Sequence, residues 1–296
     1  MVVIVNAGSG SVDGDGKVDA IEQGFKDIGL DADIHMANPK KTLSAIAREA
    51  AEGDAAIVVA AGGDGTVSAV ANSLVGSQKM LGVIPLGTLN HFAKDLGIPP
   101  DIADAIRVIS ESVVCEIDVG EVNGRYFINN SSIGLYPRIV RKRKQQERLG
   151  RGKWWAAAWA GWRFLWLSPF LKVRLELEDN QLRRKTPFVF VGNNQYEMDL
   201  YNIGRRLRLD QGKLSVYLLH RSGRTGLILL IARTIFGMLR QAKDFEEFRT
   251  KSLTIETRRK RMLVAFDGEV DVMETPLEYR IHPKKLRVIV PRQEQQ

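Results

Sequence analysis

Residues 55–75 read AAIVVAAGGDGTVSAVANSLV, and this stretch carries the strongest structural signal in the chain. Ala55–Ala61 is a short apolar run with β-branched residues, which predicts a buried strand. Gly62–Thr66 follows without a spacer, and the small and apolar residues after it predict a helix. Glycines allow close backbone approach, and a helix N-terminus offers N–H groups with partial positive charge. The stretch therefore predicts a phosphate-binding loop in an α/β protein.

Asp64 is the unusual member of this loop, because a carboxylate repels phosphate unless a cation lies between them. The loop therefore predicts a metal–nucleotide complex, with Asp64 as a candidate Mg²⁺ ligand. The other candidate nucleotide contacts here are Gly62, Gly63, Gly65 and Thr66. The alternative is an ordinary turn, which is less expected for a GGDGT run set between a strand and a helix.

Two more polar, glycine-containing loops follow predicted strands in the first 120 residues. The loop after Val2–Val5 offers the candidate nucleotide contacts Asn6, Ser9 and Gly10, and the loop after Lys79–Leu86 offers Gly87, Thr88 and Asn90. Thr88 could cap the next helix or donate to a phosphate, and Asn90 could hold a ligand or its neighbouring loop. Strands and helices alternate here, which predicts a parallel sheet with the three loops at its carboxyl edge.

Charge and strand pattern both change near residue 120. Residues 1–120 contain 8 Lys and Arg and 17 Asp and Glu, a net charge of −9, whereas residues 121–296 contain 35 and 18, a net charge of +17. Short alternating strands dominate the second part, which predicts a β-sandwich with helices near 138–168 and 224–242. We therefore expect an α/β domain at 1–120, completed by 286–296, and a sandwich at 121–285. A basic half suits a polyanion such as an anionic membrane surface.

A basic segment and all five tryptophans share one predicted helical region at 138–170. Trp155, Trp159, Trp162 and Trp166 recur at helical spacing, after a cluster that includes Arg141, Lys142, Arg143 and Lys144. Indoles on one helical face beside cations suit a bilayer interface, and these residues are candidate membrane or lipid contacts. Packing of the helix on the sandwich is an equal alternative. Nucleic acid is not expected, because no binding motif accompanies the charge.

Asp267–Gly268–Glu269 follows the apolar run Met262–Phe266. Phosphoryl transfer to an alcohol needs a carboxylate to orient the hydroxyl and accept its proton, which makes Asp267 a candidate base. A hairpin turn is the alternative, since Asp-Gly favours such turns. The single cysteine, Cys115, fits a reducing compartment, and we expect neither a signal peptide nor a transmembrane helix.

These motifs, in this order, resemble the diacylglycerol kinase catalytic-domain family of soluble bacterial lipid kinases, which is related to sphingosine and ceramide kinases. The resemblance implies a phosphofructokinase- and NAD kinase-like nucleotide domain, a lipid-binding sandwich and an active site in the cleft between them. It implies Mg-ATP as the phosphate donor, bound by the three loops, and Asp267 as the catalytic base. Glu269 would support Asp267 or the metal.

One departure from the family concerns a structural Mg²⁺ ion. Many members read Asp-Gly-x-Leu-Asp where this chain has Gln211–Ser215, so Gln211 and Ser215 replace the two aspartates. Neutral side chains are poor Mg²⁺ ligands, which argues against that structural ion.

The resulting prediction is a lipid kinase, cytoplasmic and peripheral at the inner face of the membrane, that phosphorylates a diacylglycerol-like hydroxyl. The alternatives are a NAD kinase-like enzyme with a soluble substrate and a catalytically silent lipid- or nucleotide-binding regulator. The identity of the lipid and the presence of a homodimer are left open.

Overall fold

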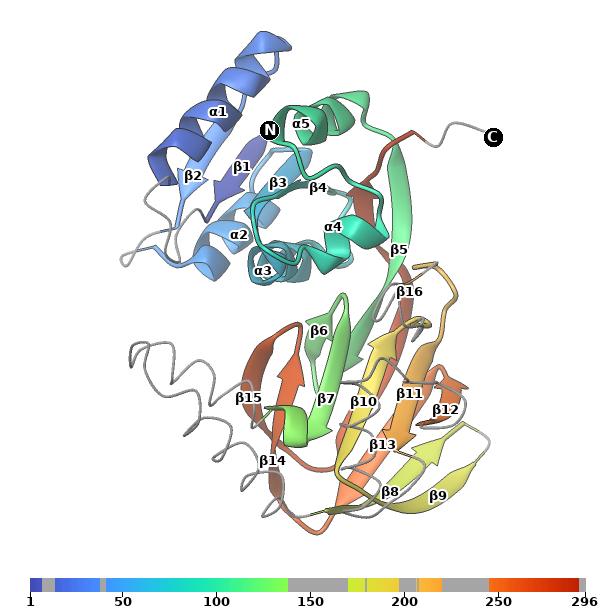
Figure 1. Cartoon of the computed structure of the whole chain (residues 1–296). Helices are drawn as coiled ribbons and strands as arrows, with labels where there is room; N and C mark the ends of the chain where they lie inside the picture. The colour runs from blue at the N-terminus through green and yellow to red at the C-terminus, as the bar shows by residue number, and fades with distance from the viewer. Residues whose placement is uncertain are drawn as a thin grey trace, which may run out of the picture. The chain divides into compact units, whose positions relative to one another are not determined.

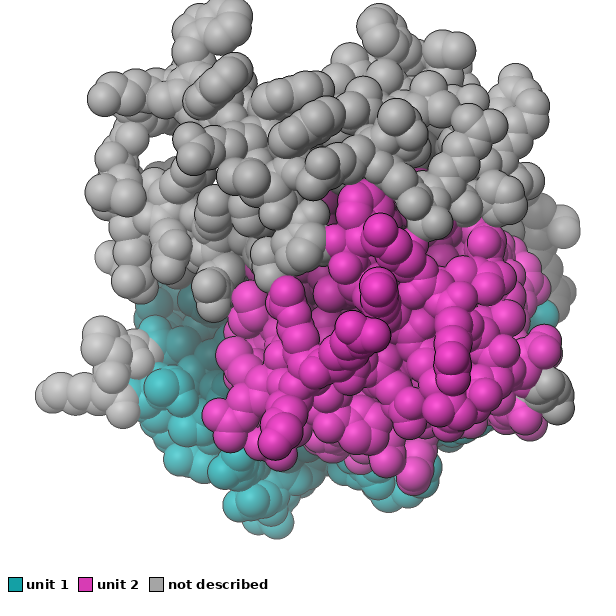
Figure 2. Space-filling model, turned by 90° about the horizontal axis from the view of Figure 1, so that it is seen from below, with its two compact units in different colours: residues 1–119, 205–211, 282–296 teal, residues 120–204, 212–281 magenta. Residues whose placement is uncertain are grey.

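A computed structural model describes residues 1–6, 14–37, 41–137, 170–178, 180–196, 206, 208–219 and 245–292. The chain divides into two compact units, one of residues 1–119, 205–211 and 282–296 and the other of residues 120–204 and 212–281 (Figure 2). Residues 205–211 thus belong to the first unit, although the sequence alone suggested the second. The helices expected near 138–168 and 224–242 lie outside the described residues.

The first unit is a parallel sheet covered by helices on both faces, as the alternating pattern predicts. Its strands run in the order β2-β1-β3-β4-β16. Helices α1 and α5 lie on one face, and α2 and α3 lie on the other (Figure 1). The strands are β1 (Val2–Val5), β2 (Asp33–Met36), β3 (Ile57–Gly62), β4 (Met80–Pro85) and the end of β16 (Leu277–Ile289). The helices are α1 (Gly14–Asp27), α2 (Leu43–Glu52), α3 (Asp64–Leu74), α4 (His91–Asp95) and α5 (Ile102–Glu111).

Local sequence explains the helix starts in this unit. The Thr42 side chain accepts a hydrogen bond from the Ala45 N–H at the start of α2. The Asp101 side chain accepts from the Ala103 and Asp104 N–H groups at the start of α5. Both residues satisfy N–H groups that a helix terminus leaves unpaired. No side chain caps α3 in this way, so the first N–H groups of that helix have no capping side chain.

The second unit is a sandwich of two mainly antiparallel sheets, which confirms the predicted fold class. One sheet contains β8, β9 and β13 with the first part of β16, and the other has the order β12-β11-β10-β7-β14-β15. Buried residues from both sheets form one core, including Leu175, Leu253, Val191 and Val216. Strands β5 and β16 each contribute residues to both units. Within the described residues, no helix has the length and apolar character needed to cross a bilayer.

The strands of this unit are β5 (Val114–Val122), β6 (Arg125–Phe127), β7 (Asn130–Gly134), β8 (Leu171–Leu177), β9 (Gln181–Thr186), β10 (Phe188–Asn193), β11 (Leu214–Leu219), β12 (Phe245–Thr250), β13 (Ser252–Thr257), β14 (Arg261–Phe266) and β15 (Glu269–Glu274).

Candidate functional site

The three predicted loops follow three adjacent parallel strands, so they meet at one edge of the first unit's sheet. Strand β3 pairs with β1 on one side and β4 on the other. Asn6, directly after β1, donates from Nδ2 to the Thr66 hydroxyl at 3.2 Å, and its N–H donates to the Ala61 carbonyl at 3.0 Å. Asn6 therefore ties the first loop to the second. Ser9 and Gly10 lie outside the described residues.

The glycine loop after β3 leaves the start of helix α3 open. Gly63 is the N-cap residue and no side chain caps the helix. A Cβ at Gly62 would lie 2.4 Å from the Thr66 hydroxyl oxygen, so only glycine fits against this first turn. Exposed Gly65 lies in the same turn. Uncapped N–H groups at a helix N-terminus form an anion site, and here glycines leave room for the ligand.

The loop after β4 packs directly against this turn. A Cβ on Gly87 would lie 2.6 Å from the Cα of Gly63, which means that the two backbones need glycine to approach so closely. Asn90 has a left-handed backbone with φ 48°. Its side chain accepts from the Gly87 N–H at 3.0 Å and donates to the Gly87 carbonyl at 2.8 Å. Of the two roles open to Asn90, the structure supports holding its own loop.

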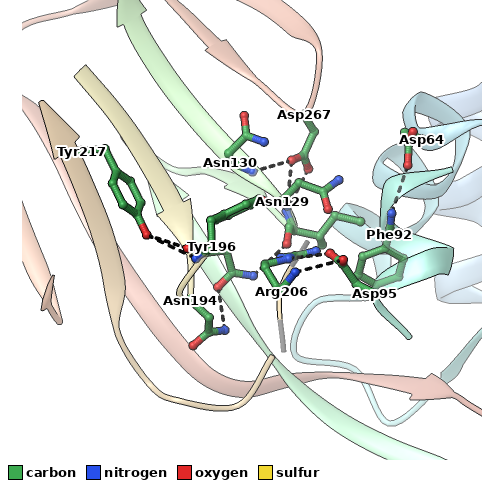
Figure 3. Close-up of polar contacts among 12 residues, drawn as sticks. Asp64, Phe92, Asp95, Asn129, Asn130, Asn194, Tyr196, Arg206, Tyr217 and Asp267 are labelled. Atoms are coloured by element: carbon green, nitrogen blue, oxygen red, sulfur yellow. Dashed lines mark hydrogen bonds and ion pairs between the residues drawn. The ribbon is translucent and has the colours of Figure 1, made fainter. Parts of the chain in front are cut away.

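The exposed Thr88 does not cap the following helix, because Asn90 is the N-cap residue of α4. The capping alternative for Thr88 is therefore wrong, and in the part of the chain that the structure describes nothing binds its hydroxyl. Asp64, half-buried at the start of α3, accepts a hydrogen bond on Oδ1 from the Phe92 N–H at 3.2 Å (Figure 3). Among the described residues, the structure gives its other oxygen no partner, which leaves Oδ2 available to a cation.

Asp267 occupies a tight hairpin between β14 and β15 in the second unit. Asp267 and Gly268 have φ values of 46° and 81°, as a type I′ turn requires. The turn alternative is thus correct, yet the side chain has a further role. Its carboxylate accepts from the N–H groups of Ile128, Asn129 and Asn130 at 2.8, 2.8 and 3.1 Å (Figure 3). Only 8% of Asp267 is exposed.

These three bonds constrain what Asp267 can do chemically. A carboxylate has about four acceptor positions, and the three backbone donors occupy most of them and hold the group in one orientation. The donors stabilise the charged form of the group. Glu269, at the start of β15, is exposed.

Buried asparagines surround the Asp267 turn, and the sequence analysis did not identify them. Asn193 donates from Nδ2 to the Ile128 carbonyl and from its N–H to the Asn129 carbonyl, both at 2.9 Å. Asn194, with φ 66°, donates from Nδ2 to Asn193 Oδ1 at 3.4 Å. The sequence signal was present, because paired asparagines follow an apolar run at both 129–130 and 193–194. Polar side chains are rarely buried unless they hold backbone or ligand groups.

A second unforeseen feature is a buried ion pair in the first unit. Arg206 Nε donates to Asp95 Oδ2 at 2.7 Å, and the Arg206 N–H donates to Asp95 Oδ1 at 3.2 Å. The two side chains are 0% and 4% exposed. The Leu209 carbonyl nearby accepts from the Asp118 N–H at 2.8 Å. These contacts fix the described part of segment 205–211 to the end of α4 and to β5.

The segment Gln211–Ser215, where the sequence argues against a structural Mg²⁺ ion, has no set of side chains that fits this ion among the described residues. Asp210, the carboxylate directly before Gln211, accepts two hydrogen bonds from Arg208 at 3.0 and 3.1 Å. The Arg208 guanidinium lowers the pKa of Asp210. Gln211 is exposed and Ser215 is buried. Within the described ranges, no three His, Cys, Asp or Glu side chains gather as a metal site.

The proposed membrane contacts all lie outside the described residues. These are Arg141, Lys142, Arg143, Lys144, Trp155, Trp159, Trp162 and Trp166. The structure does bring together one part of the candidate site, at a single edge of the first unit's sheet. This part consists of Asn6, Asp64, Thr66, Gly87 and Asn90.

A nucleotide-type α/β unit joined to a sandwich is the class of fold that these observations define. A crystal structure of a diacylglycerol kinase from Bacillus anthracis str. Sterne has this fold. It superimposes with a TM-score of 0.71 at 21% sequence identity, covering 98% of this chain and 96% of that one. At such identity the likeness establishes the fold alone.

Sequence comparison identifies the family. Residues 1–122 match the diacylglycerol kinase catalytic domain, and residues 145–290 match the YegS C-terminal NAD kinase beta sandwich-like domain. The chain belongs to the diacylglycerol kinase catalytic-domain family.

Two curated relatives agree with this assignment over part of their lengths. Diacylglycerol kinase of Bacillus subtilis is 42% identical over 110 residues, which is 36% of each chain. Diacylglycerol kinase of Staphylococcus epidermidis is 29% identical over 178 residues, which is 60% of this chain and 56% of the relative. The matches thus span about a third to just over half of the relatives' lengths.

Proposed function

We propose that this chain is an ATP- and Mg²⁺-dependent lipid kinase that phosphorylates the hydroxyl of a diacylglycerol-like lipid at a membrane surface. The observation that carries the proposal is the uncapped first turn of α3 behind the Gly62–Gly65 loop. The Gly87 loop packs against that turn, and both loops lie at the carboxyl edge of a parallel sheet. Family membership supports the same chemistry, and both named curated relatives are diacylglycerol kinases.

In this proposal the first unit binds the nucleotide. The N–H groups of Gly63–Thr66 bind phosphate oxygens, and the exposed Thr88 hydroxyl donates another hydrogen bond. Asp64 Oδ2, which has no partner among the described residues, would bind the Mg²⁺ that accompanies ATP. Asn6 acts indirectly, because its side chain holds Thr66. Positioning and charge neutralisation supply most of the catalysis in phosphoryl transfer.

Asp267 is the proposed base. The lipid oxygen forms a bond to the γ-phosphorus while the bond from that phosphorus to the bridging oxygen of ADP breaks, and the hydroxyl proton passes to Asp267. The three backbone donors fix the carboxylate in one orientation, which supports a role in positioning the lipid hydroxyl. Glu269 is proposed to assist from its exposed position.

The proposed setting is the cytoplasmic face of the membrane, with the chain bound peripherally and lipid as the acceptor. A NAD kinase-like enzyme with a soluble acceptor is the main rival, because the sandwich belongs to a NAD kinase-like domain type. A silent lipid- or nucleotide-binding regulator is the second rival.

The test is transfer of labelled phosphate from Mg-ATP to a panel of lipids in vesicles, with NAD as a soluble acceptor in parallel. Asp267→Asn is compared with Asp271→Asn, the same substitution at an exposed position in β15. We expect label in one lipid product with wild type and Asp271→Asn, and little with Asp267→Asn. Label in NAD alone would support the rival kinase, and ATP binding without any transfer would support the regulator.

A further inference from the structure

Strands β8, β9 and β13 carry a cluster of cations on the side of their sheet that faces away from the sandwich core. Along β8, Leu171, Val173 and Leu175 are buried, while Lys172 and Arg174 alternate with them. Along β9, Arg183 and Lys185 are exposed. Successive side chains of a strand point to opposite faces, so these four cations share the outer face.

The strand register places like charges directly opposite one another. Lys172 pairs with Lys185, and Arg174 pairs with Arg183. Arg258 directly follows the end of β13 at Thr257, which lies opposite Val173, and it lines the same hollow as Lys172 and Lys185. Like charges directly opposite in a sheet are destabilising. The pairing of Lys172 with Lys185 therefore opposes folding of this sheet.

Most of these cations also lack a neutralising partner. Arg174 is the exception, because it pairs with Glu176 at 3.2 Å and Glu256 at 3.5 Å. Among the described residues, no carboxylate pairs with the other four, Lys172, Arg183, Lys185 and Arg258. We call these four residues the basic face. They line an open hollow of about 590 Å³.

Protection of a sheet edge does not account for the basic face. Strand β9 is at the edge of its sheet (Figure 1), where charged side chains discourage pairing with other chains. That role covers Arg183 and Lys185. It does not cover Lys172 on the inner strand β8, nor Arg258 on the far side of that strand.

We propose that the basic face binds the surface of an anionic phospholipid bilayer. The proposal deepens the proposed lipid kinase function and rests on it, because a lipid acceptor requires the chain to reach a membrane. Several cations that have no carboxylate partner among the described residues match, on a broad sheet face, a surface of many lipid phosphates, and the open hollow admits headgroups. Anionic lipids would also relieve the repulsion between the paired rows.

The test compares a variant with all four residues of the basic face changed to glutamine and a control variant of equal charge. The control changes Lys26, Arg48, Arg107 and Lys251 to glutamine, which are two exposed lysines and two exposed arginines elsewhere. Binding is measured by sedimentation with phosphatidylcholine vesicles that contain or lack phosphatidylglycerol. Transfer of phosphate to lipid dispersed in neutral detergent micelles is measured in parallel.

We expect the basic-face variant to bind phosphatidylglycerol vesicles roughly 600-fold more weakly than wild type, since each of the four cations near an anionic surface contributes roughly 5-fold. The control variant should stay within about 3-fold of wild type. The basic-face variant should unfold at the same temperature as wild type or higher, because like-charge pairs are removed. Its micellar activity should be unchanged.

Equal vesicle binding by the two variants would overturn the proposal, and so would a lower unfolding temperature specific to the basic-face variant. Wild-type binding to duplex DNA that depends on these four residues and exceeds binding to vesicles would also overturn it. Failure of the proposed kinase function has a different signature, because wild type would then lack micellar activity whatever its vesicle binding.

Discussion

Replacing Asp267 with asparagine tests the structural reasoning most directly, because the carboxylate both anchors a backbone segment and is the proposed base. Oδ1 accepts from the N–H groups of Asn129 and Asn130, and Oδ2 accepts from the Ile128 N–H. An asparagine amide can keep its oxygen at the first position. Its NH₂ group then faces the Ile128 N–H, so one buried donor loses its acceptor.

The expected loss of stability follows from the hydrogen bonds that the substitution removes. A hydrogen bond to a charged acceptor contributes about 1.5–3 kcal/mol, and an unsatisfied buried donor costs about 1–3 kcal/mol. These terms overlap, so we expect Asp267→Asn to lower the free energy of unfolding by about 3 kcal/mol. With a urea m-value of about 3 kcal/mol/M, the unfolding midpoint should fall by about 1 M. Urea unfolding followed by circular dichroism measures this shift.

A matched control separates lost stability from lost chemistry. Leu218→Ala truncates a side chain that is 1% exposed in β11, and it should cost about 2–5 kcal/mol without touching the carboxylate. Under conditions where both variants are folded, Asp267→Asn should reduce phosphate transfer by about 100- to 10,000-fold more than Leu218→Ala. An unchanged unfolding free energy in Asp267→Asn would refute the anchoring role. Transfer equal to that of Leu218→Ala would refute the base.

Other parts of the structure give further expectations. Gly87→Ala should weaken Mg-ATP binding by roughly 10-fold in calorimetry, since its Cβ would lie 2.6 Å from the neighbouring loop; Gly16→Ala in α1, whose Cβ would meet nothing within 4 Å, should bind normally. Asp95→Asn removes the charge of the carboxylate that pairs with the buried Arg206 guanidinium and should cost about 3–5 kcal/mol in urea unfolding; a loss below about 1 kcal/mol would contradict that. EDTA without nucleotide should leave the unfolding temperature unchanged, because the described residues form no metal site; a clear fall would show a structural ion. Burial raises the pKa of Tyr217 from 10.0 to about 12. The stabilisation that comes from keeping the buried Tyr217 hydroxyl protonated is therefore fully present below pH 10 and is lost as the pH rises toward 12. Because phenylalanine cannot ionise, Tyr217→Phe should lose less stability than wild type over that range.

The sequence predicted the first unit well because its signals are local. The apolar run before Gly62 could only be a buried strand, and the glycines after it define a turn that a side chain would block. Because parallel strands bring their carboxyl ends to one edge, the order of the motifs was enough to predict that the loops after β1, β3 and β4 meet. The roles of single side chains were less accessible. Thr88 and Asn90 each had two possible roles, and the structure shows only that Thr88 does not cap α4 and that Asn90 holds the Gly87 backbone.

The sequence by itself determined the fold class, the three loops and the candidate carboxylates, since strand period, glycine position and apolar runs act over a few residues. Only the tertiary structure revealed what depends on partners far along the chain. Asp267 meets Ile128 across a separation of 139 residues, and Arg206 meets Asp95 across 111. The pairing of Lys172 with Lys185 likewise depends on the register of two strands, which a turn and a core fix together. The Asp267 and Arg206 contacts form because burial leaves these polar groups little water, so their partners come from wherever the fold places them.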